Sequence, residues 1–196
     1  PNYTALHYWY SNYLSRVTRD HFQATEQALK AIELEPMIAH SHSTLSSAYL
    51  CCEKYQEALA CSHTAIELDE NSFLGYCALC MSLNGIGKRD KAIEAIKLGV
   101  SVSGRHQYAL HLLSWLYGLN GNVQEVQKIL DELIVRSETE FISGVSLSVA
   151  AYYSENYDES FKFLERAFEQ RVGLLISMSS WPFLEYKRTD PRFKFF

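Results

Sequence analysis

The sequence lacks the features that mark several classes of protein. No stretch approaches the roughly 18 uninterrupted apolar residues of a membrane-spanning helix, and the opening residues, PNYTALHYWY, have neither the basic region nor the long apolar region of an export signal. Alternation of polar and apolar residues with the period of a strand is absent, and the four prolines avoid the expected helix interiors. We therefore expect an all-α protein that neither enters a membrane nor carries its own export signal.

The chain also lacks a basic patch and an even set of cysteines. Its 18 Lys and Arg are scattered and its formal net charge is −5, so we expect no binding of nucleic acid by this segment. The five cysteines are irregularly spaced, and two of them, Cys51 and Cys52, are adjacent. This pattern favours free thiols in a reducing compartment over a disulfide framework, which predicts a cytoplasmic location.

Motifs of catalysis and metal binding are scarce too. The sequence has no G-x-S-x-G, no P-loop and no G-x-G-x-x-G, and its glycines fall in expected turns. Cys77 and Cys80 form a C-x-x-C pair, but a zinc site needs four converging ligands and no second pair is presented with them. We expect buried thiols, no catalytic residue, no metal and no cofactor. A metal protein or enzyme built on this pair is the less favoured alternative.

What the sequence does contain is an internal repeat of 34 residues. The tetrapeptide AIEL occurs at 31–34 and again at 65–68. Steps of 34 from Ala24 reach residues that are all small or compact, namely Ala58, Ala92, Val126 and Ser160. Five copies are predicted, without insertion or deletion, at about 3–36, 37–70, 71–104, 105–138 and 139–171.

Each copy is expected to form two amphipathic helices. In the second copy Leu45, Ala48, Tyr49 and Cys52 follow the spacing of one helix face, and a second series begins at Tyr55 after a break. Small residues recur where the two helices cross closely, because a large side chain would hold the backbones apart. One pair cannot bury its apolar face alone, so the pairs are expected to stack into a solenoid.

The repeat resembles the tetratricopeptide repeat. The pattern small-Leu-x-x-x-Tyr, then Tyr-x-x-Ala and a further Ala, is carried in the second copy by Leu45, Tyr49, Tyr55, Ala58 and Ala65. The resemblance covers about 170 residues and recurs in register. It implies a right-handed α-solenoid of helix-turn-helix repeats over residues 1–171, followed by a capping helix and tail over 172–196.

The tail departs from the repeat. Asp190 is placed to cap a final helix that starts at Pro191, and the phenylalanines at the end of the chain are expected to pack onto the last repeat. The segment 164–193 is similar to the tails of repeat domains that follow a catalytic or DNA-binding domain in bacterial signalling proteins, among them nucleotide cyclases, protein kinases and winged-helix regulators. This similarity implies the C-terminal regulatory part of a longer bacterial protein.

The resemblance also implies a binding surface. In the tetratricopeptide family the first helices of the pairs line an inner groove that binds extended or helical peptides, and its lining positions can be carried over. They are Leu6, Trp9, Tyr13, Arg16, His40, Ser43, Ser47, Leu50, Cys77, Met81, Asn84, Tyr108, His111, Trp115 and Tyr152. This lining is aromatic and apolar with few charges, as in binding hot spots.

Three roles stay open from the sequence. The favoured role is a non-catalytic scaffold or adaptor that binds a protein, a peptide or an upstream domain of the same protein. In the second, Trp9, Tyr13 and Trp115 instead close a tightly wound superhelix, so the groove is filled from within. In the third, the exposed edge repeat or the Phe-rich tail drives self-association into a homo-oligomer.

Overall fold

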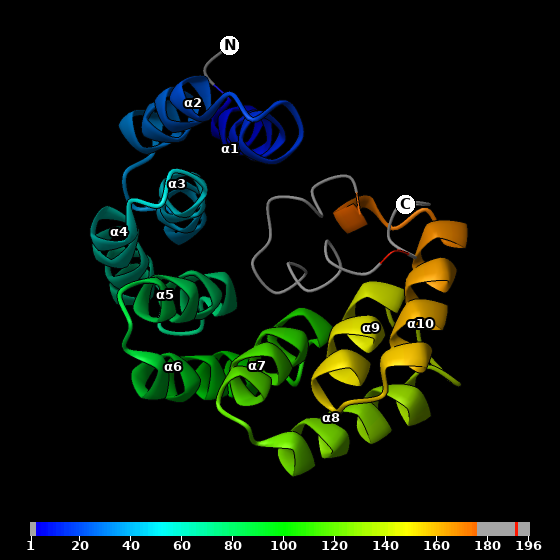
Figure 1. Ribbon diagram of the computed structural model, residues 1–196. Coiled ribbons are helices and arrows are strands. Elements are labelled where there is room, and N and C mark those ends of the chain that lie inside the picture. The colour runs from blue at the N-terminus through cyan, green and yellow to red at the C-terminus, as the bar shows by residue number, and fades with distance from the viewer. Residues whose placement is uncertain (1–2, 176–190, 192–196) are drawn as a thin grey trace. The chain divides into compact units, whose positions relative to one another are not determined.

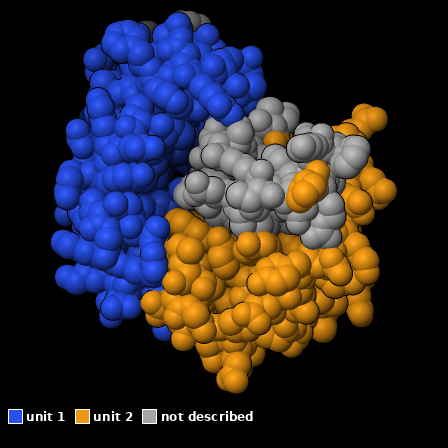
Figure 2. Space-filling view, viewed as in Figure 1, with its two compact units in different colours: residues 1–104 blue, residues 105–196 orange. Residues whose placement is uncertain are grey.

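The structure is a computed structural model that describes residues 3–175 and residue 191. Every regular element in that part of the chain is a helix (Figure 1), which confirms the predicted all-α class. The chain forms two compact units, unit 1 with residues 1–104 and unit 2 with residues 105–196 (Figure 2). None of the described helices has the length and apolar character needed to cross a membrane.

Unit 1 consists of three helix pairs. Its helices are α1 (Thr4–Tyr13), α2 (His21–Leu34), α3 (Ala39–Cys51), α4 (Tyr55–Leu68), α5 (Phe73–Gly85) and α6 (Arg89–Val102). Each odd-numbered helix packs against the next even-numbered one. α3 also packs against α1 and α5, so the first helices of the three pairs lie side by side (Figure 1).

Unit 2 contains two further pairs. Its helices are α7 (Gln107–Leu119), α8 (Val123–Arg136), α9 (Gly144–Tyr153) and α10 (Tyr157–Glu169). α9 packs against the other three, and its residues 144–151 are buried on every side. A short 3₁₀ turn follows at 173–175. The expected final helix, its Asp190 cap and the packing of the terminal phenylalanines lie outside the described residues.

The second helices of the pairs keep the repeat of 34 residues without deviation. They begin at His21, Tyr55, Arg89, Val123 and Tyr157. The small series that starts at Ala24 is fully buried in all five copies, as expected from close helix crossing. A Cβ atom added at Gly99 would lie only 2.9 Å from the Cβ of Tyr76, so the backbones of α5 and α6 approach too closely there for a larger residue.

Buried hydroxyl groups tie the first helix of a pair to the second. The Ser46 Oγ donates a 2.7 Å hydrogen bond to the Ala58 carbonyl, and the Ser11 Oγ donates a bond of the same length to the Ala24 carbonyl. In the last pair the Ser160 Oγ donates back to the Ser148 carbonyl at 2.6 Å. Ser46 and Ser148 are separated by a multiple of 34, whereas Ser11 precedes Ser46 by 35.

The prediction of no insertion is therefore wrong for the first repeat. A left-handed residue ends the turn after the first helix at Arg19, Glu53, Gly87, Gly121 and Glu155, each 34 residues after the one before. The extra residue must lie between Ser11 and Arg19, where a π-helical turn, η1 (Leu14–Thr18), follows α1. A π turn holds one residue more than an α turn, so it absorbs the insertion without changing the rest of the repeat.

Candidate functional site

Three aromatic rings meet where α1 packs on α3. The ring centroids of Tyr8 and His40 are 4.3 Å apart, and Trp9 lies 5.8 Å from Tyr8 and 6.1 Å from His40. The rings are tilted by 50–58°, a geometry that aromatic pairs favour over a face-to-face sandwich. We call Tyr8, Trp9 and His40 the aromatic triad. Trp9 is 64% exposed, so the triad presents an open ring surface.

His40 contributes a neutral ring to this surface. Burial lowers its pKa, so the imidazole carries no charge at neutral pH. Its Nε2 atom is buried and has no hydrogen-bond partner among the described residues. A buried ring nitrogen without a partner costs free energy, which is a cost that residues at binding sites often carry. The triad therefore suits an apolar or aromatic side chain better than an anion.

A positive charge lies further along the same helices. The π turn η1 places Arg16 so that its Nη2 donates a 2.8 Å hydrogen bond to the Ser47 Oγ of α3. Burial raises the pKa of the neighbouring Cys51 thiol, although the Arg16 charge opposes this, so Cys51 is protonated at neutral pH. Leu50 is half-buried beside it. This part of the surface is polar and cationic, in contrast to the triad.

The insertion changes which residues of α1 occupy the lining positions. A spacing of 34 predicted Trp9 and Tyr13 as the equivalents of Ser43 and Ser47. The observed spacing of 35 assigns those positions to Tyr8 and Asn12, and the Asn12 amide donates to the Tyr8 carbonyl at 3.0 Å.

Trp9 still reaches His40, but Tyr13 stacks on Tyr10 instead, with centroids 6.3 Å apart and planes within 12°. Leu6 is exposed on the same side of α1 as Tyr10.

The predicted lining residues of α5 are mostly core residues. Residues 77–83 of this helix are all buried, so Cys77 and Met81 offer no surface, and Ser43 of α3 is buried as well. These three residues were predicted to line an accessible surface, but they are buried in the structure, where α3, α4 and α5 pack against one another. Asn84 is half-buried, and its Oδ1 accepts a 3.3 Å hydrogen bond from the Arg89 Nε.

In unit 2 the predicted lining is also largely buried. Trp115 is 3% exposed and His111 is fully buried, with its Nδ1 3.3 Å from the Ser146 Oγ. Burial lowers the pKa of His111 to about 3, so this imidazole is neutral. Tyr108 makes an edge contact with His111 at 4.8 Å. In this structure Trp115 and His111 belong to the packed interior rather than to an accessible surface.

Tyr152 is the one lining position predicted in the last copy. It is half-buried, and its ring makes edge contacts with Tyr153 and Tyr157 at 5.2 Å and 5.1 Å. These contacts link the end of α9 to the start of α10. Tyr152 therefore packs within its own helix pair.

The C-x-x-C pair does not have the geometry of a metal site. The Cys80 Sγ donates to the Cys77 carbonyl at 3.1 Å, and both thiols are buried. Burial raises the pKa of both, so they remain protonated, whereas a zinc ligand must be a thiolate. Within residues 3–175 and at 191, no three His, Cys, Asp or Glu side chains come close enough to hold a metal ion.

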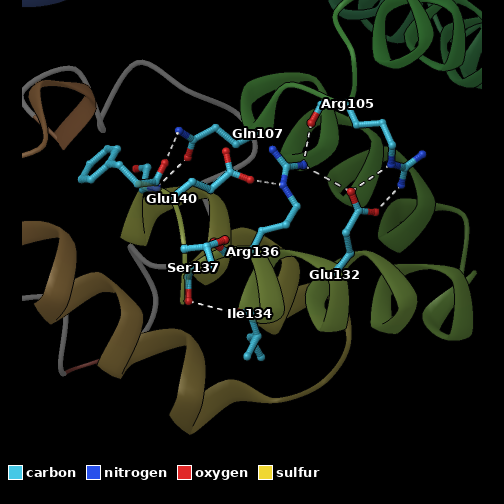
Figure 3. Close-up of polar contacts among 10 residues, drawn as sticks. Arg105, Gln107, Glu132, Ile134, Arg136, Ser137 and Glu140 are labelled. Atoms are coloured by element: carbon cyan, nitrogen blue, oxygen red, sulfur yellow. Dashed lines mark hydrogen bonds and ion pairs between the residues drawn. The ribbon is translucent and has the colours of Figure 1, made fainter.

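A polar network, which the sequence did not reveal, fixes the turn between α8 and α9 (Figure 3). Arg136 donates to the Arg105 carbonyl at 2.8 Å, to Glu132 at 3.2 Å and to Glu140 at 2.5 Å. Arg105 also binds Glu132 through its Nε at 2.9 Å and through a second, shorter contact. The network lies at the surface and joins the start of α7 to α8, which indicates a structural role.

Gln107 makes further hydrogen bonds that tie the start of α7 to the segment before α9. Its Nε2 donates to the Phe141 carbonyl at 3.2 Å, and its Oε1 accepts from the Ser143 amide at 2.6 Å. One side-chain amide thereby satisfies two backbone groups of the segment before α9 (Figure 3). The Ser143 side chain in turn caps α9 by accepting from the Val145 amide.

Comparison with solved structures identifies the fold. A thermophilic TPR protein of Thermus thermophilus superimposes with a TM-score of 0.69 at 17% identity, covering 91% of this chain and 97% of that one. This chain has the tetratricopeptide-repeat fold. A putative kinesin light chain of Podosopora anserina with TPR-like repeats is also similar, with a TM-score of 0.61 at 15% identity, covering 87% of this chain and 95% of that one.

Another structural match comes from a complex of several proteins. The structure of Naa15/Naa10 bound to HypK-THB gives a TM-score of 0.58 at 17% identity, covering 86% of this chain and 25% of that one. No protein-family model and no curated protein sequence matches the chain. At these identities the likeness establishes the tetratricopeptide fold and leaves the function to be argued from the surface.

Proposed function

We propose that this chain is a non-catalytic interaction module that binds a protein or peptide on the α1–α3 side of unit 1. The observation that carries the proposal is the aromatic triad, in which an exposed Trp9 stands beside Tyr8 and a neutral His40. Tryptophan, tyrosine and arginine are the residue types that dominate binding energy at interfaces, and Arg16 lies on the same two helices. The complex of Naa15/Naa10 with HypK-THB supports protein binding by this type of fold.

The chemistry of the surface suggests what it binds. The triad offers neutral ring faces, which favour an apolar or aromatic side chain, whereas Arg16 favours a carboxylate. The tetratricopeptide fold presents such residues along parallel first helices, so one extended peptide can reach both. We therefore propose a peptide segment that carries an apolar residue and an acidic residue.

The proposed setting is a larger bacterial signalling protein in the cytoplasm. It is supported by the similarity of segment 164–193 to the tails of repeat domains in nucleotide cyclases, protein kinases and winged-helix regulators. In this setting the chain is a C-terminal regulatory part, and its ligand is either another protein or an upstream domain of the same protein. No catalytic residue is assigned to the chain itself.

Affinity capture with a matched control tests the proposal. The immobilised wild-type chain, a Trp9→Ala variant and a Phe22→Ala control are exposed to a native lysate and to a random peptide library. Phe22 is an exposed aromatic residue of α2, outside the triad. We expect the wild type and the control to retain the same ligand and Trp9→Ala to lose it while keeping its circular dichroism spectrum. Equal retention by all three proteins, or retention by none, would overturn the proposal.

A further inference from the structure

Two anchor points for a ligand lie on one side of α3. His40 belongs to the aromatic triad, and Ser47, seven residues later in the same helix, holds the guanidinium of Arg16. Seven residues make almost two full turns, so the two side chains lie on the same side of α3 and about 10.5 Å apart along its axis. Each anchor joins a residue of α3 to a residue of α1, so two packed helices fix the distance between them.

The two anchors differ in chemistry. At the first, the tilted rings of Tyr8, Trp9 and His40 offer neutral apolar faces. At the second, Arg16 offers a positive charge and several N–H donors, so it can bind Ser47 and a ligand carboxylate together. A ligand that uses both anchors therefore presents an apolar and an acidic side chain on its same side, about 10.5 Å apart.

This distance discriminates between the conformations of a bound peptide. In a β-strand, residues three apart point to opposite sides, and residues two or four apart are separated by about 6.6 Å or about 13 Å. In a polyproline II helix, residues three apart point to the same side and are separated by about 9.3 Å. In an α-helix, residues seven apart point to the same side at about 10.5 Å. Polyproline II and the α-helix are therefore the conformations that fit.

The surface between the anchors favours polyproline II. It carries the half-buried polar side chains of Asn12, which lies between Tyr8 and Arg16, and of Ser47. Among the described residues the Ser47 Oγ only accepts, from Arg16, so its hydroxyl can still donate to a ligand. The carbonyls of polyproline II have no internal partners and can accept that bond, whereas an α-helix has already paired its own. Aromatic-lined surfaces are also the ones that dock polyproline II segments.

We propose that the α1–α3 side of unit 1 binds a polyproline II segment in which an apolar residue and an acidic residue are three positions apart. The apolar residue packs on the aromatic triad, and the acidic residue binds Arg16. Prolines between them hold this conformation before binding, which reduces the conformational entropy lost on binding. This inference rests on the proposed function, because it specifies the ligand of the same surface.

Fluorescence anisotropy with labelled synthetic peptides tests the spacing. Each peptide has one Leu and one Glu two, three or four positions apart, in either order, with prolines only between them and never three positions from the Glu. We expect a peptide with a spacing of three to bind at least about tenfold more tightly than those with two or four. At the other spacings the two side chains diverge by about 120°, so the charged hydrogen bond is lost. A helical peptide with Leu and Glu seven positions apart should bind more weakly.

Two variants and a matched control connect the preference to the anchors. Arg16→Met keeps a long side chain but removes the charge, so it should abolish the preference for a spacing of three and leave weak binding through the triad. Trp9→Ala should weaken the binding of every peptide. Lys30→Met removes a charge from the exposed surface of α2 and should change neither the affinities nor the preference. Circular dichroism establishes that each variant is folded.

The spacing series on the wild type requires no variant and decides the inference even if Arg16→Met unfolds. Equal affinities at the three spacings, tighter binding of the helical peptide, or no binding of any peptide would overturn it. So would a folded Arg16→Met protein that keeps the preference. If the spacings bind equally but Trp9→Ala weakens them all, the inference fails and the proposed function stands. If Trp9→Ala binds the peptides as tightly as the wild type, both fail.

Discussion

The Ser46 hydroxyl lies against the backbone of α4 and donates a 2.7 Å hydrogen bond to the Ala58 carbonyl. Both residues are essentially inaccessible to solvent, so α3 and α4 touch through a hydroxyl and a methyl group. Equivalent contacts join Ser11 to Ala24 and Ser148 to Ser160. The small residues of the repeat thus mark where two backbones approach and exchange a hydrogen bond.

An Ala58→Leu variant should lose stability at this crossing. The larger side chain has no space between α3 and α4, so we expect the free energy of unfolding to fall by about 1–3 kcal/mol. Urea unfolding followed by circular dichroism measures the change. Ala60→Leu on the exposed side of α4 is the matched control and should unfold within about 0.5 kcal/mol of wild type. Equal midpoints for the two variants would show that the crossing is not tight.

Trp115 and Trp9 should respond oppositely to truncation. Trp115→Ala removes a buried ring from α7, so we expect a loss of about 3–5 kcal/mol in unfolding free energy. Trp9→Ala removes a mostly exposed ring and should cost about 0.5 kcal/mol or less. Thermal unfolding of both variants compares them directly. If the Trp115→Ala protein were as stable as wild type but bound the ligand poorly, Trp115 would be an accessible residue of the binding surface, contrary to this prediction.

Mild acid should destabilise the protein through His111. Its pKa is lowered to about 3 in the folded state from 6.5, so between these values the unfolded chain binds the additional proton. Stability is therefore retained above pH 6.5 and declines as the pH falls toward 3. The urea midpoint of wild type should drop over this range, and a His111→Phe variant should drop less. His63→Phe, at an exposed position, should follow the wild type.

The network around Glu132 should contribute at neutral pH and vanish in acid. Hydrogen bonding from Arg105 lowers the pKa of Glu132 below 4.5, so the carboxylate stabilises the fold above that pH and stops doing so as the pH falls through the lowered pKa. Glu132→Gln should cost about 1 kcal/mol or less at pH 7, because the network is partly solvated. Its urea midpoint should converge with that of wild type as the pH falls through the lowered pKa of Glu132. A difference that persists in acid would mean that packing, not charge, is responsible.

The fold was predictable because the second helices repeat without deviation. Ala24, Ala58 and their equivalents reveal the crossing points directly, since only small residues fit there. The insertion in α1 was harder to see, because Tyr8 and Trp9 are both aromatic and either fits the pattern of a lining position. The signal that could have shown it is Ser11, which precedes Ser46 by 35 residues.

The sequence predicted which residues occupy the lining positions better than it predicted which of those residues are exposed to solvent. Trp115 and Trp9 are the same residue type and both were predicted to line the groove, yet Trp115 is buried and Trp9 is exposed. Burial depends on which other elements cover a helix side, and the repeat pattern of one helix pair does not contain that information. The network around Glu132 was not predicted, because it joins Arg105 to residues 27 and 31 positions further along the chain and such long-range contacts cannot be read from the repeat pattern.

The π turn η1 gives this repeat array a simple route to altered recognition. One added residue between Ser11 and Arg19 rotates α1 by about 100° relative to an uninterrupted repeat, so the ring of Tyr8 lies 4.3 Å from that of His40 and the ring of Trp9 lies farther away, at 6.1 Å. Loss of a single codon there would exchange the two rings without altering any other helix. Adding or removing one residue in this turn can therefore change which side chains of α1 face the ligand. The packing between the helices of the later repeats stays the same.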